Sequence, residues 1–199
     1  MHITEVLKLG IIRKSISRHR SPAFIVNKHS EQVRGKSRMA INNTIDDGYD
    51  IPNKAKLTNS IQGSKVFCKF DCKSSFWQIK MHPDSIEWIA FTYPLGHYES
   101  LIMPFRLKNA PSIFSKKIDE VFRKFRNFIC IYIDDILVHS KSRAEHIGHL
   151  KLVLSKFLKE GIIISSKKVQ FFRSNIEFLG IEIGNGKIKL QPHISKKIL

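Results

Sequence analysis

The amino-acid sequence predicts an α+β protein built on an antiparallel sheet with helices on one face. Two observations support this class: short apolar runs that are typical of strands, and two longer stretches whose apolar residues recur at helical spacing. Their order along the chain, ββ…βαββαβββ, is that of an α+β fold. Hydrophobic residues make up 42% of the 199 residues and charged residues 26%, so the chain is apolar enough to bury a core.

The first elements are short. Apolar residues at positions 3, 6, 7 and 11 lie on one face of a helix expected over residues 2–12. Strands are expected at 23–26 and 38–41, and the polar, Gly-containing segment 27–36 between them predicts a hairpin loop. The segment 65–71 (Lys-Val-Phe-Cys-Lys-Phe-Asp) predicts a further strand, which ends at Asp71.

The second half of the sequence is more regular. Helical periodicity runs from Ala110 to residue 125, opened by Asn109 and Pro111, and again from about Ser142 to Lys159. Between these helices, residues 128–133 and 136–138 predict two apolar strands that meet at an acidic turn. Residues 176–183 and 187–190 flank a Gly-Asn-Gly turn, which is typical of a β-hairpin. No linker rich in Pro, Gly or Ser divides the sequence.

The charge balance predicts a polyanionic partner. Lys and Arg number 34 against 17 Asp and Glu, a formal net charge of +17. The longest apolar stretch near the middle, residues 128–133, is far shorter than the roughly 18 residues of a membrane span, so no membrane partner is expected. With 3 Cys and no signal-peptide pattern at the N-terminus, we expect an intracellular protein without disulfides.

Asp134 and Asp135 are the most informative residues, because they lie between two apolar strands while Asp71 ends another. Two like charges about 4 Å apart repel by roughly 4 kcal/mol at an effective dielectric of about 20. A divalent cation would offset this repulsion, and carboxylate oxygens are ligands that Mg²⁺ accepts. The alternative is that the Asp-Asp pair forms a solvated turn, where Asp is common.

Several segments resemble those of reverse transcriptases. Tyr132-Ile-Asp-Asp135 resembles the YxDD box of that family, and residues 70–80 resemble its first-aspartate motif. Residues 21–24 (Ser-Pro-Ala-Phe), 103–111 and 178–180 (Phe-Leu-Gly) match further family segments in the same order. The resemblance covers nearly the whole chain and is closest to the polymerases of gypsy-type retrotransposons and plant pararetroviruses, especially badnavirus-like ones.

The resemblance implies a right-hand polymerase fold, in which a palm sheet is backed by helices. It places the fingers at about 1–60 and 84–115, the palm at about 61–83 and 116–190, and the start of a thumb connection at 191–199. The implied activity is RNA-directed DNA polymerisation, in which a primer 3′-hydroxyl attacks the α-phosphate of a dNTP.

The resemblance also assigns roles to individual residues. Asp71, Asp134 and Asp135 would be the catalytic carboxylates, and with the Cys72 carbonyl they would hold two Mg²⁺ ions, for which Mn²⁺ could substitute. Nucleotide binding falls to Arg38, Phe76 and Phe105. Template and primer contacts fall to Pro104, Arg106, Tyr132, Phe178, Leu179 and Gly180. Simpler roles stay open: a core aromatic for Phe76, a solvated charge for Arg38, and a hairpin that merely packs for 178–180.

The chain also departs from the family pattern. Arg106 stands where members usually have Gly, and a short stretch that members carry is missing after Asn42. Both departures predict impaired activity, because the first lies close to template and nucleotide and the second would shift Arg38. The sequence stops near Leu199, where a thumb would begin, so we expect a fragment of a polyprotein or a degraded endogenous copy, with protease and RNase H parts elsewhere.

We therefore expect an RNA or DNA template with its primer, and dNTPs, as partners. The expected location is the cytoplasm or a virus-like particle, with the nucleus as an alternative. The alternative function is that of a catalytically inactive nucleic-acid-binding remnant of a reverse transcriptase. A basic structural or capsid-associated protein would fit the charge but not the acidic triad. Among the remaining residues, we expect surface histidines and solvated lysines at His139, His146, His149, Lys167 and Lys168.

Overall fold

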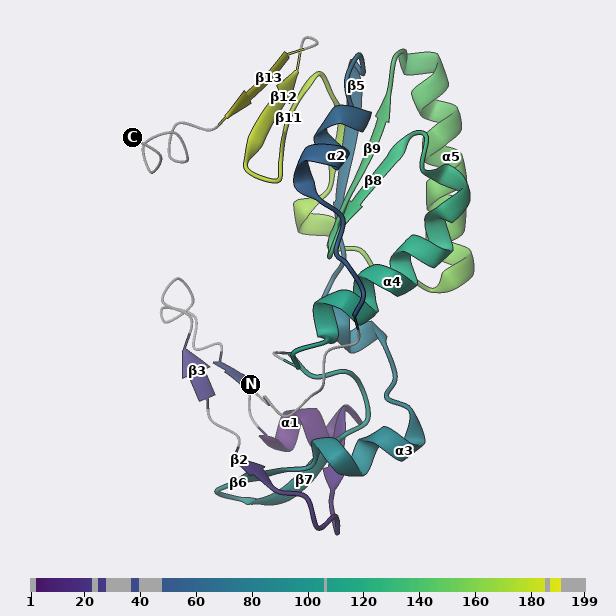
Figure 1. Ribbon diagram of the computed structural model, residues 1–199. Helices are drawn as coiled ribbons and strands as arrows, with labels where there is room; N and C mark the ends of the chain where they lie inside the picture. Colours follow the sequence, from purple (N-terminus) through teal and green to yellow (C-terminus); the bar gives the residue numbers. More distant parts are fainter. Residues whose placement is uncertain are drawn as a thin grey trace, which may run out of the picture. The chain divides into compact units, whose positions relative to one another are not determined.

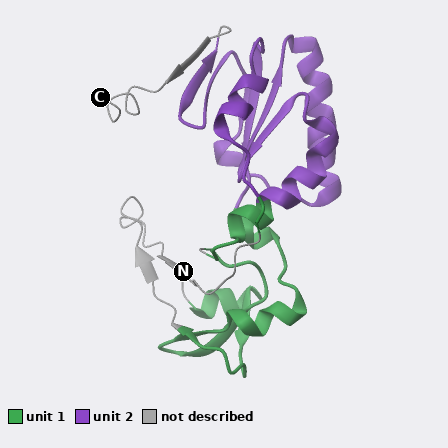
Figure 2. Ribbon diagram, in the orientation of Figure 1, with its two compact units in different colours: residues 1–49, 74–114 green, residues 50–73, 115–199 purple. Residues whose placement is uncertain are grey.

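The structure, a computed structural model, describes residues 3–22, 25–27, 37–39, 48–105, 107–184 and 187–190 (Figure 1). The chain divides into two compact units, each built from two separate segments (Figure 2). Unit 1 comprises residues 1–49 and 74–114, and unit 2 comprises residues 50–73 and 115–199. One boundary falls inside helix α4 (Ala110–Phe122) and another two residues after the end of strand β5 (Val66–Asp71), which explains why no linker composition marks them.

Unit 1 contains a four-stranded sheet with the order β1-β7-β6-β2 and a separate pair, β3-β4. The strands predicted at 23–26 and 38–41 are found as β3 and β4, which pair in antiparallel fashion; residues 28–36 of the predicted loop lie outside the described residues. Its elements are α1 (Ile3–Lys8), β1 (Ile12–Lys14), β2 (Ser21–Pro22), β3 (Ile25–Asn27), β4 (Ser37–Met39), η2 (Ser75–Gln78), α3 (Pro83–Ile86), η3 (Glu87–Ile89), β6 (Phe91–Tyr93) and β7 (Gly96–Ser100).

The first helix is shorter than the apolar spacing predicts. It ends at Lys8, two residues before Gly10, which has a φ of 66°. This left-handed conformation suits glycine and stops a helix. Ile11 therefore lies outside the helix, and the following strand contributes Ile12 to a small core with Val6.

Unit 2 is built on a four-stranded antiparallel sheet with the order β10-β5-β9-β8. A second sheet, β11-β12-β13, is antiparallel as well. The expected α+β class is confirmed. Besides β5 and α4, the elements of unit 2 are α2 (Lys54–Ser60), η4 (Arg123–Phe125), β8 (Ile129–Tyr132), β9 (Asp135–Ser140), α5 (Arg143–Glu160), η5 (Ser166–Lys168), β10 (Gln170–Arg173), β11 (Asn175–Phe178), β12 (Ile181–Gly184) and β13 (Lys187–Leu190).

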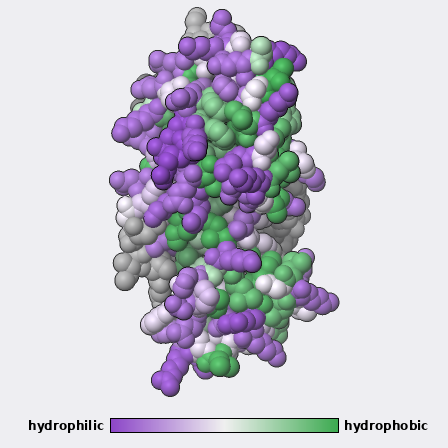
Figure 3. Space-filling model, turned by 90° about the vertical axis from the view of Figure 1, so that its right-hand side faces the viewer, coloured by the Kyte–Doolittle hydropathy of each residue, from purple (hydrophilic) through white to green (hydrophobic). Residues whose placement is uncertain are grey.

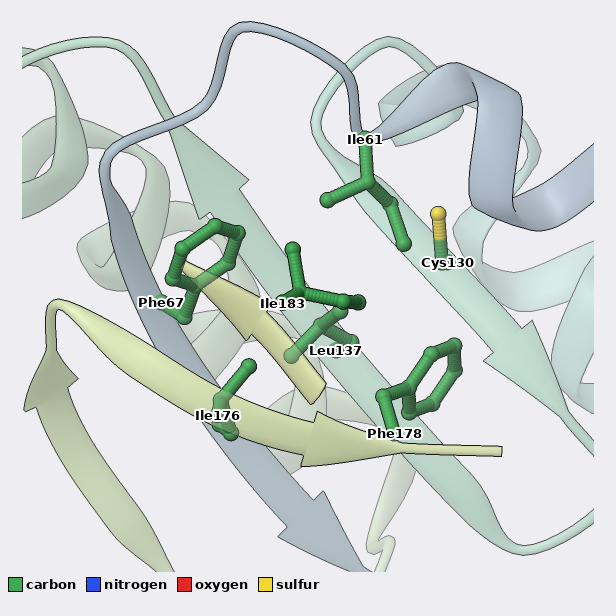
Figure 4. Packing of buried hydrophobic residues seen from close by; sticks show 7 residues of the cluster. All are labelled: Ile61, Phe67, Cys130, Leu137, Ile176, Phe178 and Ile183. Atoms are coloured by element: carbon green, nitrogen blue, oxygen red, sulfur yellow. The ribbon is translucent and has the colours of Figure 1, made fainter. Parts of the chain in front are cut away.

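The expected helices back one face of the central sheet of unit 2, and the other face is covered as well. On one face, Phe70 packs against Phe157 of α5. On the other face, α2 and the second sheet enclose a buried cluster (Figure 4), made of Ile61, Phe67, Cys130, Leu137, Ile176, Phe178 and Ile183. The reason is that β5, β8 and β9 carry apolar residues at successive positions, so that both faces need cover.

The long helix α5 confirms the second helix prediction. Ser142 caps its N-terminus by accepting a hydrogen bond from the N–H of Glu145, and Gly161 ends it with a φ of 67°. Hydrophilic and hydrophobic residues intermingle on the face that Figure 3 shows, and α5 itself exposes Ile147, Leu152 and Leu158. In the part of the chain that the structure describes, every helix is too short or too polar to cross a lipid bilayer.

Candidate active site

Three aspartates come together at one end of the central sheet of unit 2. β5 ends at Asp71 and β9 begins at Asp135, and these two residues are register partners. Asp134 lies in the turn that joins β8 to β9. The N–H of Cys72 donates a hydrogen bond to the carbonyl oxygen of Asp134 at 3.0 Å, which ties the end of β5 to this turn. The predicted strands and turn therefore bring the three carboxyl groups into one neighbourhood.

The turn between β8 and β9 is strained. Tyr132 and Asp135 pair directly, so Ile133 and Asp134 are the two loop residues of the hairpin. Ile133 has a φ of 55°, which is an outlier for a β-branched residue. A positive φ at the first loop residue is the pattern of a type II′ turn, which normally takes glycine there. Strain of this kind clusters at functional sites, and here it adjoins the carboxylates.

Two lysines neutralise part of the acidic charge. The ammonium of Lys168 donates a hydrogen bond to Oδ2 of Asp71 at 2.9 Å, and the Lys69 ammonium lies 3.3 Å from Oδ1 of Asp135. The expectation that Lys168 is merely solvated is therefore wrong. The sequence analysis missed the contact between Lys168 and Asp71 because the two residues are 97 positions apart. The contact depends on how η5 docks beside β5.

Burial is the main cause that disfavours the charged forms of Asp134 and Cys72, and repulsion between acidic groups adds to it. Burial raises the pKa of the Asp134 carboxyl, and the charges of Asp135 and Asp71 raise it further. Burial also raises the pKa of the Cys72 thiol to about 12, with the three aspartates adding to the shift. The hydrogen bond to Asp71 raises the pKa of Lys168. Because the Cys72 thiol stays protonated, only the backbone carbonyl of this residue suits a hard cation.

The donor set fits Mg²⁺ by its chemistry, since it consists of carboxylate oxygens and one backbone carbonyl. Within the described residues, however, no three acidic, histidine or cysteine side chains are arranged to hold a metal ion. Asp71 and Asp135 instead each face a lysine. The carboxylates that would bind a cation are thus present and close in the fold, and two of them are paired with ammonium groups.

The segment 178–180 forms a tight turn rather than the middle of one strand. The strand predicted at 176–183 is broken into β11 and β12, with Phe178 paired to Ile181 across the turn. Leu179 and Gly180 have φ values of 55° and 82°, the pattern of a type I′ turn. The Phe178 side chain is fully buried, which leaves it no surface for the predicted primer contact. Its role is to anchor the turn, and primer positioning by the turn stays a prediction.

The nucleotide-binding residues predicted from the resemblance fall in unit 1. Phe76 is half-buried and packs near Phe105, with ring centroids 5.7 Å apart, so the core-aromatic alternative describes its contacts, and the sugar-selecting role stays a prediction. Pro104 is buried, and its template contact stays a prediction. Arg38 lies in β4, where only the backbone is described, and Arg106 and the segment after Asn42 up to residue 47 lie outside the described residues.

Two of the histidines expected at the surface are buried. His139 and His146 lie in the core of unit 2, where burial lowers the pKa of each to about 4. His146 bridges Ser140 and Cys68, with Nδ1 2.7 Å from the hydroxyl oxygen and Nε2 3.1 Å from the sulfur. These contacts satisfy both ring nitrogens, which is how a histidine is tolerated in a core. The contacts with Ser140 and Cys68 give His146 a structural role in the core of unit 2.

Comparison with known proteins places this site in a family. The family described as "Reverse transcriptase (RNA-dependent DNA polymerase)" matches residues 11–183. The "Enzymatic polyprotein" of Cauliflower mosaic virus (strain CM-1841) is 48% identical over 202 residues, which cover 98% of this chain and 30% of the polyprotein. "Polyprotein P3" of Commelina yellow mottle virus is 43% identical over 209 residues, which cover 98% of this chain and 11% of that protein.

A solved structure supports the same family assignment. The foamy viral protease-reverse transcriptase dRH in complex with ds DNA matches with a TM-score of 0.85 and 25% identity, over 98% of this chain and 35% of that one. The chain thus spans about a third or less of the proteins it matches. The family match covers most of the chain, including the aspartate-bearing hairpin, and the fold agrees with it. The chain belongs to the reverse transcriptase (RNA-dependent DNA polymerase) family.

Proposed function

We propose that this chain is the polymerase part of a reverse transcriptase and transfers dNMP to a primer 3′-hydroxyl. The observation that carries the proposal is the placement of Asp71, Asp134 and Asp135 at one end of an antiparallel sheet, in a protein of this family. Carboxylates so close together need cations, and phosphoryl transfer uses cations held in this way. The proposed palm, about 61–83 and 116–190, falls mostly in unit 2, and the proposed fingers, about 1–60 and 84–115, fall mostly in unit 1.

Asp71 and Asp134, with the Cys72 carbonyl, are the ligands proposed for two Mg²⁺ ions, and Asp135 adds negative charge beside them. When bound, the ions supply the positive charge that activates the primer hydroxyl and stabilises the transferred phosphate. The protein itself orients these ligands: the Cys72–Asp134 hydrogen bond and the Asp71–Asp135 pairing hold the carboxylates in a fixed frame. Lys69, beside Asp135, keeps part of the repulsion neutralised.

Nucleic acid is the proposed macromolecular partner. The net charge of +17 supplies a sequence-independent attraction for phosphates, and a solved relative with the same fold is described in complex with ds DNA. Template with primer, dNTPs and the remaining parts of a polyprotein follow from the family as proposals. Base pairing with the template would select each nucleotide, while the protein provides geometry and electrostatics.

The second candidate is a catalytically inactive remnant that binds nucleic acid. It is favoured by Arg106, which adds a long cationic side chain where family members usually have Gly. We therefore expect the unmodified chain to extend primers weakly. Arg106→Gly, together with restoration of the segment missing after Asn42, should raise extension by roughly tenfold or more, since small misplacements near the chemistry cost about 10²-fold.

Mg²⁺-dependent primer extension tests the proposal. The wild type, Asp134→Asn and Asp84→Asn are compared on one labelled primer–template. Asp84→Asn is the matched control, because it makes the same chemical change at a mostly exposed residue of α3. We expect extension with the wild type and Asp84→Asn but not with Asp134→Asn. Binding without extension, in the repaired chain as well, would favour the inactive remnant.

A further inference from the structure

We propose that Lys168 is an exchangeable counter-ion of the catalytic carboxylates, which occupies Asp71 in the metal-free protein and leaves it when a divalent cation binds. The inference rests on the proposed function and adds a step to it: cation binding and release of one lysine would be a single exchange. It concerns a residue whose partner the sequence did not reveal.

The main chain places Lys168 at Asp71. The N–H of Ser165 donates to the carbonyl oxygen of Asp71 at 2.8 Å, and the N–H of Lys73 donates to the carbonyl oxygen of Ile163 at 2.9 Å. Between these hydrogen bonds, Cys72 and Ile164 form a β-bridge. The segment before η5 is thus fastened to the end of β5. The ion pair is therefore a consequence of the fold and not the chance position of a long side chain.

The ammonium of Lys168 occupies an oxygen atom that a cation would need. It lies 2.9 Å from Oδ2 of Asp71, whose side chain is only 15% exposed. A divalent cation on this carboxylate would be repelled by an ammonium group at hydrogen-bonding distance. Simultaneous binding of both cations to this carboxylate is therefore unfavourable, and the divalent ion carries the larger charge.

The Lys168 side chain can move from its carboxylate into water, whereas the Lys69 side chain is held beside Asp135. The Lys168 side chain is 65% exposed, so its ammonium can return to water, and exposed ion pairs of this kind are weak. The Lys69 side chain is 20% exposed, lies beside Asp135 and has its ammonium 5.9 Å from the centre of the Phe178 ring. Only the first of these two lysines combines a carboxylate contact with easy access to solvent. We therefore assign the exchange to Lys168.

Lysine footprinting tests the exchange directly. The full chain is acylated briefly with an N-hydroxysuccinimide ester at rising Mn²⁺ concentrations, and each lysine is quantified by mass spectrometry while calorimetry records Mn²⁺ binding. We expect the acylation rate of Lys168 to rise severalfold as Mn²⁺ binds. The rates of Lys69 and of Lys156, which pairs with Glu160 on α5, should stay constant. Asp71→Asn should raise the Lys168 rate without any metal.

Affinity supplies a second measurement. Lys168→Ala should tighten Mn²⁺ binding by roughly two- to fivefold, the range that an exposed ion pair supports. Lys167→Ala is the matched control, because it removes the same charge from the neighbouring, exposed position of η5. If both variants tightened Mn²⁺ binding equally, the effect would come from the loss of any positive charge near the site. That result would overturn the exchange.

The outcomes separate this inference from the proposed function. If Mn²⁺ binds the wild type while Lys168 acylation stays constant, the metal site stands and the exchange is overturned. If Mn²⁺ binds neither the wild type nor Lys168→Ala, the metal site of the proposed function is refuted and the exchange falls with it. Binding by Lys168→Ala alone would also overturn the exchange, because Lys168 would then block the metal site instead of leaving it.

Discussion

Asp71 and Asp135 lie directly opposite each other on β5 and β9. Like charges at opposite positions of antiparallel strands destabilise a sheet, and Asp134 adds a third carboxylate in the adjoining turn. The sheet keeps this arrangement although the surrounding strands are apolar. Of its neutralising partners, Lys69 lies on β5 itself and Lys168 comes from η5, and together they offset the repulsion only in part.

Replacing one of the repelling carboxylates should stabilise the fold. The pKa of Asp134 is raised in the folded protein, so its ionisation opposes folding at neutral pH, and this cost disappears as the pH falls through that pKa. Asp134→Asn should therefore increase the free energy of unfolding at pH 7 and leave it unchanged near pH 3. Urea denaturation at both pH values measures this. A less stable variant at pH 7 would refute the repulsion argument.

The turn at 179–180 offers a test of backbone strain. Leu179 adopts a φ of 55° at a position where type I′ turns prefer Asn or Gly. Leu179→Asn should stabilise the protein by about 1 kcal/mol, because the left-handed conformation costs most residues about that much. Gly180→Ala, at a φ of 82°, should be destabilising. Thermal denaturation compares the two, and a loss of stability in Leu179→Asn would show that its side-chain packing outweighs the strain.

The buried histidines predict acid sensitivity. Burial lowers the pKa of His146 to about 4 from an ordinary value of 6.5, so the unfolded chain binds a proton that the folded chain excludes between these values. Stability should fall as the pH drops from about 6.5 to 4, by up to about 3 kcal/mol per histidine. His146→Gln should be less stable at pH 7 but should flatten this dependence. An equal pH dependence of unfolding in both proteins would contradict the prediction.

Nucleic-acid affinity should depend steeply on salt. If the chain neutralises 6–10 phosphates, its affinity for a primer–template should fall by roughly 10³–10⁵ between 50 and 200 mM salt. Sequence preference should be slight, because phosphate contacts position a protein without identifying bases. Fluorescence anisotropy with two unrelated duplexes measures both properties. A flat salt response would exclude a binding surface that follows the phosphate backbone.

The sequence predicts the elements that depend on local pattern. β5, β8, β9 and α5 are found because their apolar periodicity is strong, and the aspartates follow from the strands that carry them. The apolar pattern misses the break at Leu179, because apolar residues continue through a turn that needs only a positive φ, and it is the family resemblance that points to a hairpin at 178–180. The Lys168 contact is missed because it arises from pairing between distant segments. His146 looked like a surface residue because its partner, Cys68, is 78 positions away.

Calorimetric titration of Mn²⁺ into the wild type and Asp134→Asn tests most directly the claim that the three carboxylates form a divalent-metal site. The wild type should show saturable binding, since its carboxylate oxygens are gathered at one end of the sheet. Asp134→Asn should bind far more weakly, although its fold is expected to be at least as stable. Indistinguishable titrations of the two proteins, or heat changes of dilution alone in both, would contradict the claim.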